Sequence, residues 1–318
     1  MEKNQTAKHR IIGLTIETRP DLVTHENCQN WRHLGVTRIE MGVQSTDDNI
    51  LHLNKREHTI QKVRNALHLM RQYGFKISIH LMPGLYGSSV KKDIQTFREV
   101  FSDPYLKPDE LKIYPTSVIP HTELYHLYQT GEYQPITTEE ILQEIRILFQ
   151  EVIPPYTRIK RLIRDIPATE ITAGSSITNL SQLAHETLLK EYFPLMKGNS
   201  VKPYVQKFYT RLYEHIIVFP ESAFSSFILP KEQENLIDTF IFGSEPNLTS
   251  YRHFVSLDTR SREVRNKKEK TIHLNLIIRS YQSSVGTEYF ISYEDELGYL
   301  YGFTRLLLPF PDQTIDFP

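Results

Sequence analysis

Short apolar runs alternate with amphipathic segments along the first half of the chain. In the amphipathic segments, apolar residues recur three or four positions apart, as on one face of a helix. Thr137 or Thr138, followed by Glu140, is typical of a helix start. We expect helices at 24–34, 59–73, 89–102 and 138–151, and strands at 11–17, 37–43, 76–82, 111–114 and 158–163. This alternation predicts a parallel β/α sheet, open or curled into part of a barrel.

The alternation of strands and helices stops near residue 180. Residues 181–255 are rich in aromatic side chains and contain several prolines, and we interpret them as a mostly helical insert. Three runs of alternating apolar and polar residues follow, at 271–280, 287–293 and 298–307, and Ser, Gly and Asp lie in the turns between them. This pattern predicts an antiparallel meander. We therefore divide the chain into 1–180, 181–255 and 256–318.

Composition mainly excludes classes of protein and gives no positive sign of function. The chain has 37 Lys and Arg against 38 Asp and Glu, so its overall charge gives no reason to expect nucleic-acid binding, which must rest on local patches. No apolar run is long enough to cross a bilayer, and the first ten residues lack the apolar segment of a signal peptide. We expect a cytoplasmic protein that does not associate with membranes.

The chain has a single cysteine, Cys28. One thiol excludes an internal disulfide and any cysteine-rich zinc or iron–sulfur site built by this chain alone. We predict no metal site and identify no catalytic residue.

Polar side chains follow or end several predicted strands. Glu17, Glu40, Gln44 and His80 lie at positions that face the active site in a β/α barrel, where they are natural contacts for a ribose, an amino-acid head group or a base. The alternative is structural: Glu17 pairs with Arg19, and His80 is a hydrogen-bonded core residue. The residues alone favour this alternative for each position taken singly.

Two further groups of residues are ambiguous. Lys112 and Tyr114 alternate with apolar residues and are expected to face a barrel lumen, either at a functional site or in a structural ion pair. Arg158, Lys160 and Arg164 lie on one face of a strand, with Arg161 on the other. Such a row can follow phosphates, or it can be the charged guard of an edge strand. The basic stretch at 260–270 is more typical of a solvated face.

Nine strings, taken in order, resemble blocks of the Elongator catalytic subunit family, radical-SAM enzymes fused to an acetyltransferase domain. Their order and spacing carry the resemblance, which spans most of 4–180 and 255–309. The strings are GLTIETRPD (13–21), EMGVQS (40–45), IHLMPGLYGS (79–88), LKIYPTSVI (111–119), HTELY (121–125), RIKRLIRDIP (158–167), AGSSITNL (173–180), SREV (261–264) and ISYEDELGYLYGFTRLLLP (291–309).

The resemblance implies a partial radical-SAM barrel followed by the first strands of an acetyltransferase-like domain. It implies modification of the wobble uridine of tRNA at C5, with a 4Fe–4S cluster, S-adenosylmethionine and acetyl-CoA as cofactors. It reverses the structural interpretation of Glu17, Glu40, Gln44 and His80, which match the face that holds S-adenosylmethionine. It also makes Arg158, Lys160, Arg161 and Arg164 candidates for tRNA contacts.

The departures from the family pattern are as informative as the matches. The family's three-cysteine motif precedes the ETRPD block and is absent here, and the acetyl-CoA loop expected beyond the last strands is also absent. The family has cysteines near SREV that can bind zinc, where this chain has Ser256 and Ser261. We therefore expect a truncated or split enzyme, whose missing piece is separately encoded, or a non-catalytic tRNA-binding relative. An unrelated metabolic enzyme is a third alternative that the ordered strings disfavour.

Overall fold

The computed structural model describes residues 2–163, 166–175, 177, 179–192, 207–208, 210–212, 214, 216, 255–264, 274–295 and 298–313. Five strands of the first half form one sheet: β1 (Thr15–Thr18), β2 (Arg38–Gln44), β3 (Lys76–Leu81), β4 (Glu110–Ile113) and β5 (Arg158–Arg161). They pair in chain order, and every pair is parallel. Because the order never reverses, the sheet is a segment of barrel wall and not a doubly wound sheet.

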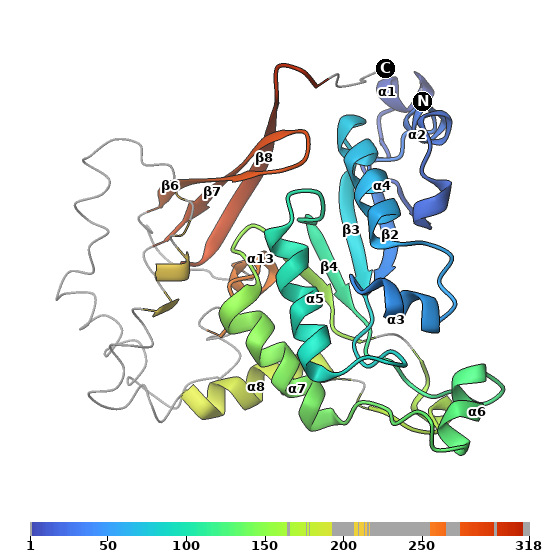
Figure 1. Ribbon diagram of the computed structural model, residues 1–318. Coiled ribbons are helices and arrows are strands. Elements are labelled where there is room, and N and C mark those ends of the chain that lie inside the picture. Colours follow the sequence, from blue (N-terminus) through green and yellow to red (C-terminus); the bar gives the residue numbers. More distant parts are fainter. Residues whose placement is uncertain are drawn as a thin grey trace.

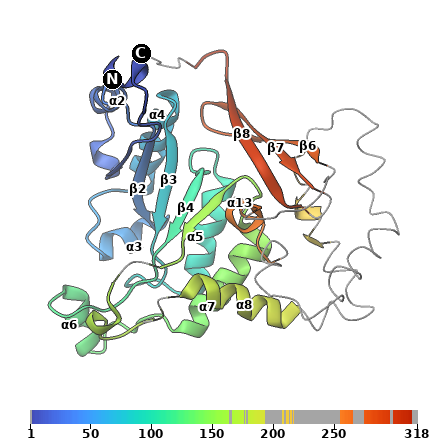
Figure 2. The same cartoon turned by 180° about the vertical axis from the view of Figure 1, so that it is seen from behind.

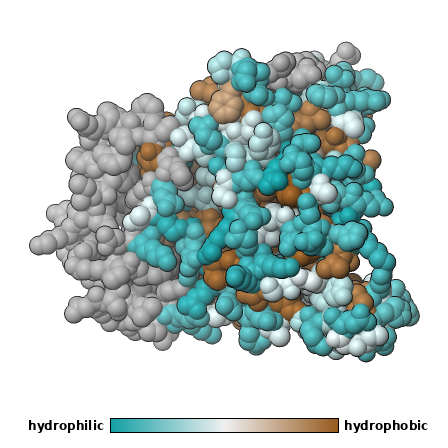
Figure 3. Space-filling view, viewed as in Figure 1, coloured by the Kyte–Doolittle hydropathy of each residue, from teal (hydrophilic) through white to brown (hydrophobic). Residues whose placement is uncertain are grey.

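Helices pack on one face of this sheet. Figure 1 shows α4, α5 and α7 in front of the strands, and Figure 2, from behind, shows β2, β3 and β4 in front of α5. Their outward faces are mostly polar (Figure 3). None of the described helices is both long and apolar enough to cross a membrane. The helices of this part are α1 (Glu2–Thr6), α2 (His25–His33), α3 (Asp48–Leu53), α4 (Ile60–Gln72), α5 (Val90–Ser102), α6 (Glu123–Gln129), α7 (Thr138–Ile147) and α8 (Leu180–Tyr192).

Strand alternation divides the sheet into an apolar and a polar face. In β2, Ile39, Met41 and Val43 are fully buried and join the core formed with the helices. Arg38 and Glu40, which alternate with these residues, point to the opposite face, and the same alternation holds in β3 and β4. The face of the sheet that is not covered by these helices therefore carries charged side chains.

Local signals explain most helix starts. Thr137 accepts from the backbone N–H of Glu140, whose carboxylate accepts from the backbone N–H of Thr137, so the predicted start of α7 is confirmed as a capping box. The predicted strand at 11–17 begins later, at Thr15, where pairing with Arg38 begins; Ile12 before it is 91% exposed. Most of 181–255, predicted as a helical insert, lies outside the described residues, and α8 covers its first part.

Three antiparallel strands form a second sheet, so the predicted fold class is confirmed. They are β6 (Asn275–Gln282), β7 (Gly286–Glu294) and β8 (Leu300–Pro309), preceded by the short helix α13 (Thr259–Arg262). The sheet contacts the β/α part through Tyr281, whose ring stacks on Tyr156 at 3.8 Å, and through an ion pair of Arg305 with Asp109 at 2.8 Å. The boundaries of the three predicted parts stay predictions.

Candidate functional site

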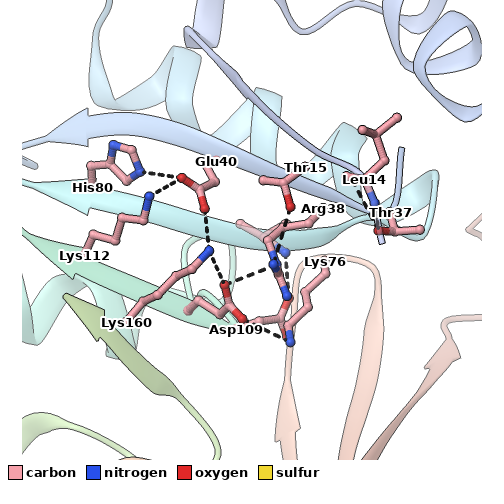
Figure 4. Close-up of polar contacts among 12 residues, drawn as sticks. Leu14, Thr15, Thr37, Arg38, Glu40, Lys76, His80, Asp109, Lys112 and Lys160 are labelled. Carbon is pink, nitrogen blue, oxygen red and sulfur yellow. Dashed lines mark hydrogen bonds and ion pairs between the residues drawn. The ribbon is translucent and has the colours of Figure 1, made fainter. Parts of the chain in front are cut away.

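An ion-pair network lies on the polar face of the parallel sheet. Its centre is the carboxylate of Glu40 in β2, which is 7% exposed. Lys112 of β4 donates to Oε2 of Glu40, and Lys160 of β5 donates to Oε1 at 2.7 Å (Figure 4). His80 of β3 places Nε2 3.3 Å from Oε2. Three neighbouring strands thus supply partners to one carboxylate.

Electrostatics fix the charge of this network. Burial would raise the pKa of Glu40, but hydrogen bonds from Lys112 and Lys160 outweigh it and lower the pKa to about 2. Burial would lower the pKa of Lys112, and its hydrogen bond to Glu40 raises it above the ordinary value. The pair is therefore charged at neutral pH, and Glu40 is no general base.

A second buried carboxylate lies on the same face. Glu110 of β4 is 3% exposed and lies 3.2 Å from Nε of Arg38, 3.2 Å from Nζ of Lys76 and 3.6 Å from Nζ of Lys160. Lys160 thus lies between Glu40 and Glu110. The sequence did not reveal Glu110 because its partners lie on other strands.

His80 lies between two carboxylates. Its Nδ1 is 3.6 Å from Oε1 of Glu17 in β1, opposite the contact to Glu40, and the ring meets Tyr114 edge-to-face at 5.4 Å. Arg19 pairs with Asp21 at 2.6 Å, so the alternative in which Glu17 pairs with Arg19 is wrong. Among the described residues, Glu17 has no Lys or Arg partner.

The three residues Glu17, Glu40 and His80 bring ligand atoms within 4.8 Å of one another. Both oxygens of Glu40 already accept from ammonium groups, which would oppose a metal cation at that position. We therefore do not propose a metal site at these residues.

The end of β2 holds two buried polar atoms without a partner. Gln44 has a positive φ of 72°, and its Oε1 makes no hydrogen bond to a described residue. Arg56 lies beside it: a Cβ added to Gly42 would meet Nε2 of Gln44 at 2.6 Å and a terminal nitrogen of Arg56 at 3.4 Å. Nε of Arg56 is buried and has no acceptor among the described residues, and burial lowers the pKa of this guanidinium. Arg56 lies in a loop after α3, where no periodicity marks it.

The predicted RNA-binding row is only partly described. Lys160 points to Glu40, and Arg158 forms an ion pair with Glu263 in the segment after α13. Arg161 is exposed, and Arg164 lies outside the described residues. Two of the four cations therefore have internal carboxylate partners, and their role toward RNA stays a prediction.

The metal centres implied by the resemblance do not fit these residues. Cys28 is fully buried in the main core, and burial raises its pKa to about 12, so it is a thiol and no ligand for a cluster. Near SREV, Ser256 donates to Asp258 at 2.9 Å, and the hydroxyl of Ser261 lies 3.1 Å from Nε2 of His185. The serines at the place of the family's cysteines thus hydrogen-bond with Asp258 and His185 of the same chain.

Comparisons with known proteins show which families and proteins this chain resembles. Residues 1–100 match the model of the radical SAM superfamily, and residues 108–190 match that of the Radical_SAM C-terminal domain. The chain is 42% identical over 188 residues to a tRNA uridine(34) acetyltransferase of Methanocaldococcus infernus, covering 59% of this chain and 35% of that protein. It is 39% identical over 176 residues to human Elongator complex protein 3, covering 55% of this chain and 32% of that protein.

A solved structure is similar over nearly the whole chain. It is the archaeal Methanocaldococcus infernus Elp3 with an N-terminal deletion, with a TM-score of 0.71 and 32% identity, covering 97% of this chain and 60% of that one. Residues 1–100 and 108–190 therefore carry the two radical SAM domains, and the resemblance to the Elongator catalytic subunit family that the sequence strings predict is confirmed. It spans about a third of the length of the curated relatives.

Proposed function

We propose that this chain provides the S-adenosylmethionine-binding face of an enzyme that modifies uridine 34 of tRNA. One observation carries the proposal. On the polar face and at its carboxyl end, most charges have partners of opposite sign, but the carboxylate of Glu17 has no Lys or Arg partner and Nε of Arg56 has no acceptor among the described residues.

An unpaired anion and an unpaired cation at one end of a parallel sheet suit a zwitterion. The amino-acid head group of S-adenosylmethionine carries an ammonium and a carboxylate. Ligands of parallel β/α sheets bind at the carboxyl ends of the strands, where Glu17, Gln44 and His80 also lie. A buried charged group without a partner is costly, so a carboxylate that reaches Nε of Arg56 removes that cost, while exposed Glu17 offers a charged acceptor to the ammonium.

The chemistry assigned to this chain is limited to binding and orientation. Glu17 would hold the ammonium, Arg56 the carboxylate, and Gln44 a polar atom of the same ligand. A 4Fe–4S cluster needs thiolates that this chain does not supply, so we assign it no cleavage of S-adenosylmethionine. Acetyl-CoA, named through the acetyltransferase relatives, is assigned to no residue here.

We infer the tRNA substrate from the relatives, whose names specify uridine 34 of tRNA. Lys112 and Tyr114, on the polar face beside His80, are the residues we assign to the lumen that would receive the base. The alternative, a non-catalytic tRNA-binding relative, depends on Arg158 and Lys160, and the ion pairs of these two with Glu263 and Glu40 favour the first proposal.

Calorimetric titration with S-adenosylmethionine tests the proposal. Glu17→Gln and Arg56→Met should each weaken binding roughly 10- to 150-fold, since a hydrogen bond to a charged group contributes about 1.5–3 kcal/mol. Arg98→Met is the matched control, because Arg98 is an exposed arginine on α5 that pairs with Glu151. No binding by the parent at millimolar ligand, or equal binding by all variants, would contradict the proposal.

A further inference from the structure

His80 makes two contacts that a neutral ring cannot satisfy together. Nε2 lies 3.3 Å from Oε2 of Glu40, and Nδ1 lies 3.6 Å from Oε1 of Glu17. Both carboxylate oxygens are acceptors, whereas a neutral imidazole has one N–H and one lone pair. One contact therefore places a lone pair against a carboxylate unless something else lies between them.

The carboxylates of Glu40 and Glu17 differ in how freely they can move, and this difference selects the tautomer of neutral His80. Glu40 is 7% exposed and is held by Lys112 and Lys160, so it cannot withdraw from Nε2. Glu17 is 67% exposed and has no cationic anchor among the described residues, so it can move. The N–H of neutral His80 accordingly belongs on Nε2, facing Glu40, and the lone pair of Nδ1 faces Glu17.

We propose that Nδ1 of neutral His80 and the carboxylate of Glu17 together accept the ammonium group of the ligand, and that protonation of His80 expels it. This inference rests on the proposed S-adenosylmethionine site. An ammonium has three donors, so it can bridge the two acceptors that otherwise oppose each other. Once Nδ1 is protonated, the imidazolium itself donates to Glu17 and takes the place of the ammonium.

The surroundings of His80 keep it neutral until the pH falls. Burial lowers its pKa below the ordinary value of 6.5, Glu17 and Glu40 oppose that effect, and the ammonium of Lys112 adds to it. Tyr114 meets the ring by its edge at 5.4 Å. Proton and ligand exclude each other at Nδ1, so each must lower the affinity for the other.

Titrations with S-adenosylmethionine from pH 7.5 to 5.5 test the inference, because the ligand's ammonium (pKa about 7.7–8.0) remains largely protonated there. Below the pKa of His80, the affinity of the parent should fall by up to about tenfold per pH unit, the limit for one linked proton. His80→Gln keeps a side-chain acceptor but does not titrate. Its affinity should change less than about twofold over this range, through the partial deprotonation of the ligand's ammonium near pH 7.5. 5′-Methylthioadenosine, which lacks the amino-acid group, should bind the parent without this pH dependence.

Two controls keep the outcomes separate. His68→Gln alters another partly buried histidine, hydrogen-bonded to Ser284, and should keep the parental pH dependence. NMR of the His80 ring in the parent needs no variant at that position: its titration midpoint should fall on adding S-adenosylmethionine. Binding with the same pH dependence in His80→Gln, or an unmoved midpoint in the ligand-bound parent, overturns this inference and leaves the site intact. Absence of binding at pH 7.5 overturns both.

Discussion

Replacing Glu294 by Gln should strongly destabilise the folded chain. Glu294 lies at the end of β7 between two fully buried guanidinium groups, Arg262 and Arg279. Its Oε2 accepts from Arg262 at 2.8 Å, and its Oε1 accepts from Arg279 at 2.6 Å and from Ser292 at 2.7 Å. The amide of Gln keeps the shape but removes the only carboxylate that ion-pairs with both arginines among the described residues.

The magnitude follows from leaving two buried cations without an anion. Burial would raise the pKa of Glu294, yet Arg262 and Arg279 lower it to about 2 from an ordinary 4.5. Removing one partner of a buried ion pair costs about 3–5 kcal/mol. Backbone carbonyls of Leu212, Leu257 and others also accept from the two arginines, which places the expected loss near the lower end of that range.

Urea unfolding of Glu294→Gln at pH 7 measures this loss. Glu99→Gln, a change at a partly exposed carboxylate on α5 that accepts from Gln95, should stay within about 0.5 kcal/mol of the parent. Because the folded pKa is depressed, the contribution of Glu294 is present above pH 4.5 and lost as the pH falls toward 2. A combined change of Arg262, Glu294 and Arg279 to apolar residues should cost less than Glu294→Gln alone. Equal stability of Glu294→Gln and the parent would refute the reasoning.

Three further predictions concern other parts of the chain. Burial and the neighbouring Asp93 raise the pKa of Glu144 to about 10, so the folded chain keeps a proton that the unfolded chain loses above an ordinary 4.5. Stability should fall between these values by up to about 1.4 kcal/mol per pH unit, and Glu144→Gln should flatten the decline in urea titrations at pH 6 and 9; an unchanged slope would contradict this. Cys28 should react with a thiol reagent only after unfolding, and anaerobic treatment with iron and sulfide should give no 4Fe–4S absorbance; a cluster spectrum would show the opposite. If the basic row serves RNA, replacing Arg158 and Lys160 by Ala should weaken filter binding of all tRNAs alike and lower the salt slope by about one unit per lost phosphate contact; if it is only a charged edge, as the ion pairs with Glu263 and Glu40 favour, binding is absent in the parent or unchanged in the variant.

Much of the fold could be predicted because it depends on local patterns. The apolar alternation at 37–43 and 76–82 marks strands that lie within one residue of β2 and β3. The helix α6 was not predicted, because none of its residues is buried and it therefore has no apolar period to find. The strand start at Thr15 was also missed, since Ile11 and Ile12 before it are apolar as in a strand but are 71% and 91% exposed.

The site was predictable only where a residue's position on a strand was enough. Glu40 and His80 point to the polar face as alternation requires. Arg56 could not be predicted, since its signal is an unsatisfied buried nitrogen beside Gln44, which appears only once the loop is folded. The pairing of Lys160 with Glu40 was missed for the same reason, because it depends on how the four strands from β2 to β5 are arranged in the folded sheet.

The partners of Glu40 imply an order of assembly during synthesis on the ribosome. His80, Lys112 and Lys160 follow Glu40 by 40, 72 and 120 residues. The strand that carries the acid thus leaves the exit tunnel long before the ammonium groups that neutralise it, and water must solvate the carboxylate in the interval. The ion pairs of Glu40 are complete only when β5 docks and brings Lys160, so such long-range contacts make this docking a late and slow step. Docking joins opposite charges, and its rate should therefore fall as ionic strength rises.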